Sequence, residues 1–240
     1  NQELTNLDWA KWGGWLDTDG FFTREENKGR FYIKTGLKLK DRLPVELFSK
    51  TFETSLIYLE HKTITPEPYR YEYIAKEYSA KIQGSKAIWF TKNVFPYLMK
   101  EEKKDFAEKL LGYRPESKHS TTWTDDETVH YLATAIEGDG SISVSGKKNS
   151  NIVTAIGSSD KQYLANIQSL SKNKLGIAST LSVVTTYKTQ KGKKTKYRVC
   201  ICSSLRNPDN LPFFQNLVKD NVMTLNRKKQ KVQDFVNCFS

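Results

Sequence analysis

The chain has 240 residues and is strongly basic, with 38 Lys and Arg against 27 Asp and Glu and a formal net charge of +11. The excess is uneven, because residues 1–120 carry 21 basic and 18 acidic side chains while residues 121–240 carry 17 and 9. This balance favours a polyanionic partner such as nucleic acid.

No apolar run approaches the roughly 18 residues of a membrane-spanning helix, and the N-terminus lacks a signal-peptide pattern. The 3 cysteines and 3 histidines include no C-x-x-C pair, which argues against zinc and favours a reducing compartment.

The first expected helix covers residues 5–18 and begins with a capping pair. Thr5 and Asp8 have the spacing at which a hydroxyl and an acid each bind the other's backbone N–H group. The helix continues into Trp-Gly-Gly-Trp-Leu-Asp-Thr-Asp-Gly at residues 12–20. A glycine inside a helix costs roughly 1 kcal/mol against alanine. Two adjacent glycines therefore favour a helix that packs very closely against a second helix.

A hairpin and a second helix are expected next. Asn27-Lys28-Gly29 is a turn signal between strands at residues 21–26 and 30–40. The second strand alternates between an apolar face for the core and a cationic face for solvent. Its apolar face comprises Ile33, Thr35, Leu37 and Leu39, and its cationic face comprises Tyr32, Lys34, Gly36, Lys38 and Lys40. Pro44 suits the first turn of a helix at residues 44–54.

The remainder of this half predicts a second hairpin, two helices and a linker. We place the strands at residues 55–62 and 71–83 and the helices at residues 85–99 and 101–111. A polar segment with Pro115 follows. We expect an N-terminal domain at residues 1–111, a linker at 112–123 and a C-terminal domain at 124–240.

The second half repeats this layout. Thr124 and Glu127 form a T-x-x-E capping box, and Leu-Ala-Thr-Ala-Ile-Glu-Gly-Asp-Gly at residues 132–140 matches the earlier segment. Asp19 and Asp139 lie 120 positions apart, half of the chain. The sequence therefore predicts two copies of one fold, each of which contributes one acid to a shared site.

The expected elements of the second half follow the same order. Its strands are at residues 141–145, 151–158, 180–188 and 194–202, and its helices are at residues 160–172, 210–218 and 226–239. Alternation directs one set of strand residues to the core and another to solvent. The first set is Ile142, Val144, Tyr197, Val199 and Ile201, and the second is Ser141, Ser143, Ser145, Lys196, Arg198, Cys200 and Cys202.

Four carboxylates sit where a helix disfavours them. Asp17, Asp19, Glu137 and Asp139 lie at the C-termini of the two repeated helices, where the macrodipole costs roughly 0.3–1 kcal/mol for each negative charge. Bringing the two helix ends together adds repulsion between like charges. Divalent cations would resolve this conflict, and hard carboxylate oxygens suit Mg²⁺. In a basic chain, this arrangement favours metal-dependent hydrolysis of phosphodiesters.

The two repeated segments resemble the motifs of the LAGLIDADG homing endonucleases, in the single-chain form that carries both copies. The penultimate acid and the final glycine are present in each copy, whereas Trp12, Trp15, Thr134 and Ala135 depart from the consensus. We expect Trp12 and Trp15 to fill space opposite Ala133 and Ala135. The resemblance implies an α+β fold of two αββαββα halves related by a pseudo-twofold axis. Two central motif helices would then lie beneath antiparallel sheets that form a saddle over DNA.

The resemblance also implies roles for individual residues. Asp19 and Asp139 would bind about two or three divalent cations, Mg²⁺ with Mn²⁺ or Ca²⁺ able to substitute for binding, and a backbone contribution at position 18 stays open. Each active site would have a basic residue: Lys228 in the second half, and either Lys100 or Lys103 in the first. Arg42 and Lys161 would position water. The residues assigned to DNA are Arg24, Tyr32, Lys34, Lys38, Lys40, Ser141, Ser143, Lys196 and Arg198.

The implied function is a monomeric, intracellular homing endonuclease in an organelle matrix or the cytoplasm. It would make a metal-dependent double-strand break with short 3′ overhangs at a long asymmetric target. An RNA-binding intron maturase and a non-cleaving DNA-binding regulator on the same scaffold remain alternatives. A homing domain from an intein is disfavoured, because no splicing domain is recognisable. Retention of both Asp19 and Asp139 favours cleavage over the regulator.

Overall fold

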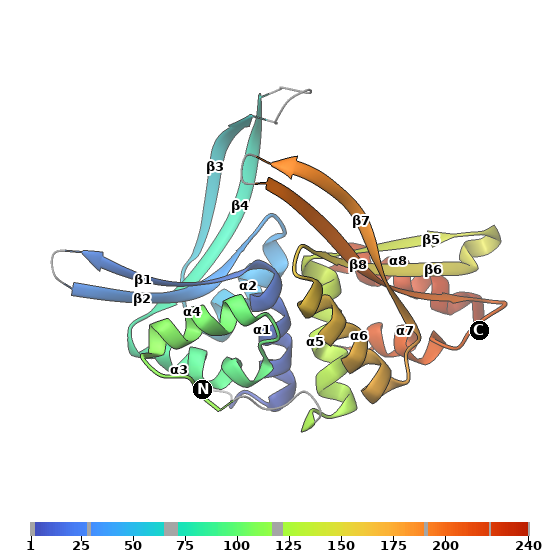
Figure 1. The fold of residues 1–240 in the computed structure, drawn as a ribbon, viewed down its shortest axis with the longest axis horizontal. Coiled ribbons are helices and arrows are strands. Elements are labelled where there is room, and N and C mark those ends of the chain that lie inside the picture. The colour runs from blue at the N-terminus through green and yellow to red at the C-terminus, as the bar shows by residue number, and fades with distance from the viewer. Residues whose placement is uncertain are drawn as a thin grey trace.

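The computed structural model describes residues 3–27, 30–64, 72–116, 122–189, 192–220 and 222–239. The chain folds into two α+β halves with matching element order, which lie side by side with strands mostly on one side and helices mostly on the other (Figure 1). The first half contains α1 (Asn6–Asp19), β1 (Gly20–Asn27), β2 (Arg30–Leu39), α2 (Arg42–Thr51), β3 (Leu56–Ile64), β4 (Glu72–Gln83), α3 (Ser85–Val94) and α4 (Glu101–Leu111). The second contains α5 (Asp125–Gly138), β5 (Gly140–Ser145), β6 (Asn151–Ser158), α6 (Lys161–Leu175), β7 (Ser179–Thr189), β8 (Gly192–Ser204), α7 (Leu211–Leu217) and α8 (Asn226–Val236). The predicted fold class is confirmed.

Each half has a four-stranded antiparallel sheet of the same topology. The strand orders are β1-β2-β4-β3 and β5-β6-β8-β7. The motif glycine begins the first strand of each sheet, with Gly20 opposite Leu37 and Gly140 opposite Ile156. The helix of each motif therefore delivers the chain directly into its sheet, and the acid before the glycine lies at that junction.

The predicted strand faces of the second sheet are mostly confirmed, although Cys200 is half-buried, and Gly36 of the first sheet, expected on the solvent-facing side, is buried. Ile142, Val199 and Ile201 are buried, whereas Ser141 and Ser143 are exposed. On β8, Lys196 and Arg198 are exposed, and so is Lys40, which directly follows β2. The side chains of Arg24, Tyr32, Lys34 and Lys38 lie outside the described part of the structure, although their backbones belong to β1 and β2.

Several expected helix boundaries were wrong. The expected helix 85–99 ends at Val94 and continues as a 3₁₀ turn at Phe95–Tyr97, because Pro96 cannot donate a helical hydrogen bond. The expected helix 226–239 likewise ends at Val236 and passes into a 3₁₀ turn at Asn237–Phe239. The helix expected at residues 44–54 is α2, which begins at Arg42, two residues before Pro44. In the second half, α6 extends past position 172 to Leu175, where Gly176 caps it in the left-handed conformation.

Both predicted capping boxes are present. The Thr5 N–H donates to Asp8 Oδ2 at 2.9 Å, and the Thr124 N–H donates to Glu127 Oε2 at 2.6 Å. The reciprocal bonds from the Asp8 and Glu127 N–H groups to the threonine hydroxyls complete each box. The two motif helices thus start alike, as the repeat requires.

Among the described residues, no helix has both the length and the apolarity to cross a membrane.

The motif helices α1 and α5 pack against each other at the centre of the molecule (Figure 1). A Cβ atom on Gly14 would lie 2.0 Å from Thr134 Oγ1 and 2.7 Å from the Tyr131 carbonyl. Gly14 therefore permits the close helix contact that the sequence predicts. Its neighbour Gly13 serves a different contact, since its Cβ would lie 2.6 Å from the Tyr97 carbonyl of the same half.

The expected position of Trp12 was wrong. Its ring packs edge-on against Phe48 at 5.3 Å and tilted against Phe52 at 5.5 Å, within the core of its own half. Position 12 precedes Gly13 and Gly14 on the helix and lies on the face toward α2, so its bulk fills the first half and leaves the helix interface to small residues. An aromatic residue that does pack between the halves is Trp123, whose ring lies 5.4 Å from Tyr97 and 5.2 Å from Tyr131.

Replacing Gly14 with alanine tests the close approach of α1 and α5. Helix propensity alone would make Gly14→Ala more stable by about 1 kcal/mol. We expect the opposite, a loss of about 1–3 kcal/mol in the free energy of unfolding, because the added methyl group overlaps Thr134 and Tyr131. Urea denaturation would measure it. The Gly14→Ala/Thr134→Ala double variant should recover part of the loss, and a stabilised single variant would contradict the packing.

Candidate active site

Asp19 and Asp139 meet where the two motif helices end. Asp19 is the last residue of α1, and Asp139 is the C-cap of α5. A Cβ on Gly138 would lie 2.6 Å from Asp19 Oδ2, so the backbone just before the second acid is pressed against the first. Burial, followed by the nearby charge of Asp139, raises the pKa of Asp19 to about 6. The structure thus brings together the two acids that the repeat singles out.

These acids have the character of a hard-cation site. Asp19 Oδ2 is buried and has no hydrogen-bond partner among the described residues. Burying a carboxylate oxygen without a partner is costly, and a bound cation would remove that cost. Carboxylate oxygens suit Mg²⁺. No cluster of three or more His, Cys, Asp or Glu occurs in the described ranges, so the chain would supply two carboxylates, with water or phosphate as the remaining ligands.

In the part of the chain that the structure describes, the Lys100 ammonium group forms an ion pair with one of these acids. Its Nζ lies 3.1 Å from Asp139 Oδ2, and its side chain is 13% exposed. The same ammonium lies over the Tyr163 ring, 4.7 Å from the centroid. Because Lys100 precedes α4 of the first half and Asp139 follows α5 of the second, this ion pair crosses between the halves.

Lys103 and Lys228 occupy equivalent positions at the ends of the motif helices. Lys103 Nζ donates to the Gly20 carbonyl at 2.5 Å, and Lys228 Nζ donates to the Gly140 carbonyl at 2.7 Å. Lys228 also donates to the carbonyls of Ile136 and Glu137, so its charge caps the C-terminus of α5. Burial lowers the pKa of Lys228 to about 8 and lowers the pKa of Lys103. Lys103 is therefore the counterpart of Lys228.

Asp17 and Glu137, which the sequence analysis grouped with Asp19 and Asp139 as carboxylates that cations would neutralise, instead share a structural role. Asp17 accepts hydrogen bonds from the N–H groups of Met99 at 2.6 Å and Lys100 at 3.2 Å. Glu137 accepts from Thr224 at 2.6 Å and from Leu225. Each acid thus fixes the segment that leads into the last helix of its half. Burial raises the pKa of Asp17 to about 6 and that of Glu137 to about 7. The signal in the sequence for this shared role was their matched position, two residues before Asp19 and Asp139.

The residues expected to position water contact other partners than the two acids. Arg42 pairs with Glu46 at 3.2 Å on its own helix. Lys161 lies 5.9 Å from the centroid of the Tyr197 ring. Within the described part of the chain, neither side chain contacts Asp19 or Asp139, so the geometry does not bring this pair into the site.

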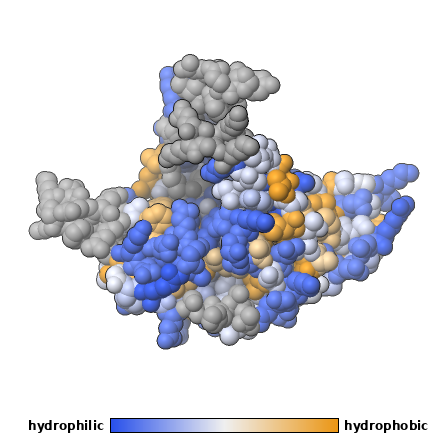
Figure 2. Space-filling view, viewed as in Figure 1, coloured by the Kyte–Doolittle hydropathy of each residue, from blue (hydrophilic) through white to orange (hydrophobic). Residues whose placement is uncertain are grey.

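Several predicted DNA-binding residues line one groove beside Asp139. The groove has a volume of about 460 Å³, and Ser141, Lys196 and Arg198 form part of its wall together with Asp139. Ser143 is exposed farther along β5. Figure 2 shows hydrophilic residues interspersed with intermediate and hydrophobic ones on the described surface of the face it views. This groove gives the second sheet a polar and cationic path that leads to the acids.

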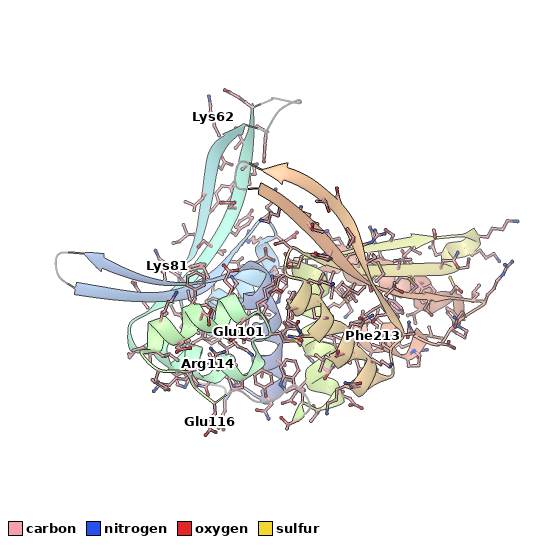
Figure 3. All side chains as sticks on the ribbon, in the orientation of Figure 1. Lys62, Lys81, Glu101, Arg114, Glu116 and Phe213 are labelled. Atoms are coloured by element: carbon pink, nitrogen blue, oxygen red, sulfur yellow. The ribbon has the colours of Figure 1, made fainter. Side chains whose placement is uncertain are left out.

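The first half presents further cations that the sequence analysis did not assign. Lys81 lies between buried Ala80 and Ile82 on β4, so it faces away from the core. Lys62 is exposed toward the far end of the β3–β4 hairpin, and Figure 3 shows Lys81 nearer the centre of the molecule. These lysines extend the basic surface onto the hairpin that rises farthest from the helices (Figure 1).

Comparison with known proteins identifies the fold. Residues 126–206 match the family described as LAGLIDADG-like domain. The homing endonuclease I-GzeII in complex with its DNA target has a TM-score of 0.58 and 15% identity, covering 98% of this chain and 89% of that one. I-AabMI bound to uncleaved DNA has a TM-score of 0.55 and 14% identity, covering 95% and 89%. I-WcaI bound to its DNA recognition sequence has a TM-score of 0.53 and 12% identity, covering 97% and 88%.

No curated protein sequence matches the chain. The structural likeness nevertheless extends over both halves, whereas the family match covers only part of the second. The resemblance inferred from the two motifs is therefore confirmed: the chain has the two-domain fold of LAGLIDADG homing endonucleases.

Stability should fall as pH rises through the range in which Glu137 ionises. Its folded pKa of about 7 exceeds the ordinary value of 4.5, so between these values the folded state binds more protons than the unfolded state. Glu137→Gln should remove this contribution, and the decline in unfolding free energy from pH 5 to pH 7 should become smaller by about 2 kcal/mol. Urea denaturation in EDTA would measure both proteins. Parallel pH profiles would contradict the role of burial.

Proposed function

We propose that this protein binds double-stranded DNA and hydrolyses both strands at a long asymmetric site, in a reaction that depends on a divalent cation. The observation that carries this proposal is the meeting of Asp19 and Asp139 at the junction of two basic sheets. Asp19 Oδ2 is buried there and accepts no hydrogen bond from the described residues. The fold and the DNA-bound state of the three similar structures support the same function.

In this proposal each sheet of the saddle binds DNA on either side of the paired acids. Lysines on the strands neutralise phosphates and supply affinity, while arginine and serine side chains contact base edges. Arg198, Lys196 and Ser141 line the groove next to Asp139, so they would contact the base pairs nearest the cut. Because the halves differ in sequence, one chain would bind a site without twofold symmetry as a monomer.

Asp19 and Asp139 would hold the divalent cation, for which Mg²⁺ is the expected choice. Such a cation would make a bound water more acidic and offset the charge of the leaving oxygen. The chain itself orients the acids, because Lys103 and Lys228 fix the backbone that follows each of them. Lys100 is then the cationic side chain placed to approach the scissile phosphate, since its ammonium already lies beside Asp139.

Neutralising either acid should separate cutting from binding. We expect Asp19→Asn and Asp139→Asn each to lower double-strand cleavage by at least about 100-fold, because each removes one carboxylate that holds the cation. Binding to the same duplex should stay within a few-fold of the wild type.

The test is a cleavage selection on a randomised DNA library with Mg²⁺, followed by rate measurements on the recovered target. Asp209→Asn, at an exposed acid outside the site, is the matched control. Undiminished cutting by either active-site variant would refute the assignment. Binding without cutting by the wild type as well would favour a DNA-binding regulator, and preferential binding of intron RNA would favour a maturase.

Binding should also weaken steeply with salt. A protein that neutralises about 6–10 phosphates loses about 10³–10⁵ in affinity between 50 and 200 mM salt, because binding releases condensed counterions. We expect a response in this range for the recovered duplex, measured by fluorescence anisotropy in Ca²⁺ to prevent cutting. A flat response would contradict a phosphate-clamping saddle.

A further inference from the structure

The hydrogen bonds of Asp17 and Glu137 place the two halves in register around the candidate site. Asp17 accepts from Met99 and Lys100, and Glu137 accepts from Thr224 and Leu225. Position 100 is therefore the counterpart of position 225. The same register pairs position 103 with 228, where both residues are lysines that bind the motif glycine carbonyl. Positions 100 and 225 break the symmetry, because one is lysine and the other is leucine.

This difference gives the two acids different environments. The Lys100 ammonium lies 3.1 Å from Asp139 Oδ2 and is held against the Tyr163 ring. Leu225 is 3% exposed and packs in the apolar core, so no equivalent ammonium approaches Asp19 from that position. Asp19 Oδ2 stays without a hydrogen-bond partner among the described residues. Among the described residues, Asp139 therefore forms an ion pair, whereas Asp19 forms none and is favoured in its ionised form by the Thr18 hydroxyl and the more distant charges of Lys100 and Lys228.

The surrounding charges preserve this inequality. The Lys228 ammonium is engaged by three backbone carbonyls, and that of Lys103 by the Gly20 carbonyl. Both lysines are thus fixed at helix ends, whereas Lys100 is directed at a carboxylate. At 13% exposure, the Lys100 ammonium is poorly screened by water, so its attraction to Asp139 is stronger than that of a surface pair.

We propose that Lys100 is a built-in cation that competes with a divalent cation for Asp139 and thereby makes the two acids unequal as metal ligands. Lys100 must release Asp139 before both oxygens of that carboxylate can bind a divalent cation, while Asp19 is free to bind one at once. This inference rests on the proposed metal-dependent function. The inference extends to cleavage: each acid would serve the cutting of one strand more closely than that of the other, so the inequality would make the two strands cut at different rates.

The decisive experiment is a Mn²⁺ titration of the protein with its duplex, followed by electron paramagnetic resonance of free Mn²⁺. Lys100→Met removes the charge but retains the backbone N–H that Asp17 binds. We expect the affinity of the weakest Mn²⁺ site to be at least about tenfold higher in Lys100→Met than in the wild type. Lys100→Arg, which keeps a cation, should resemble the wild type. Lys104→Met, at a neighbouring lysine that faces Glu101, is the matched control.

Equal Mn²⁺ isotherms for the wild type and Lys100→Met, including no binding by either, would overturn the inference. So would tightening in Lys104→Met of the same size, because the effect would then be one of net charge. A duplex labelled on each strand gives the second readout, and equal cutting rates for the two strands in the wild type would count against the inequality. The proposed function fails separately, if the wild type does not cut or if Asp19→Asn still does.

Discussion

The rest of the structure depends on how closely the two motif helices approach. Gly14 allows α1 to touch the Thr134 side chain and the Tyr131 carbonyl, and Gly138 allows α5 to touch Asp19 and Thr18. A side chain at either position would push the helix ends apart, and the two acids with them. The cost of a glycine in a helix is small, about 1 kcal/mol. In return, the close helix contact brings the ends of α1 and α5 together into one site.

The contact is reinforced by side chains that the halves exchange. The Tyr131 hydroxyl of α5 donates to Asp17 of α1, and the charge of Lys11 on α1 favours the ionised form of Glu137 on α5. Positions 11 and 131 are equivalent in the repeat, since they lie 120 residues apart. Each half therefore helps to keep the buried acid of the other half charged. These acids in turn fix the segments that carry Lys100 and Lys228.

The repeat predicted the architecture because its signals are local. The capping boxes at Thr5 and Thr124, the alternating strand of Val199 and Ile201, and the acid before each motif glycine all specify structure within a few residues. Partners far apart in the chain could not be predicted in this way. Asp17 binds Met99 across 82 positions, and Lys100 pairs with Asp139 across 39.

The same limit explains the two remaining differences. Helical spacing places Trp12 on a face but does not say which neighbour covers it, and α2 with Phe48 does so. The equivalence of Lys103 with Lys228 also required the structure, because the segments after the second hairpins differ in length and composition. The side chains of Arg24, Lys34 and Lys38 lie outside the described part of the structure, so their roles in DNA binding stay predictions.

The burial of Trp123 has a consequence for the modular exchange of halves. Its ring lies between Tyr97 and Tyr131, and the Tyr97 hydroxyl donates to Glu127 at 2.7 Å. The end of the connecting segment is thus part of the shared core rather than a passive tether. A chimera that joins either half to a half from another nuclease would have to carry this aromatic group across the junction. A split version of the chain would reassemble best if the break fell before Trp123, leaving that ring with the second fragment as its docking surface.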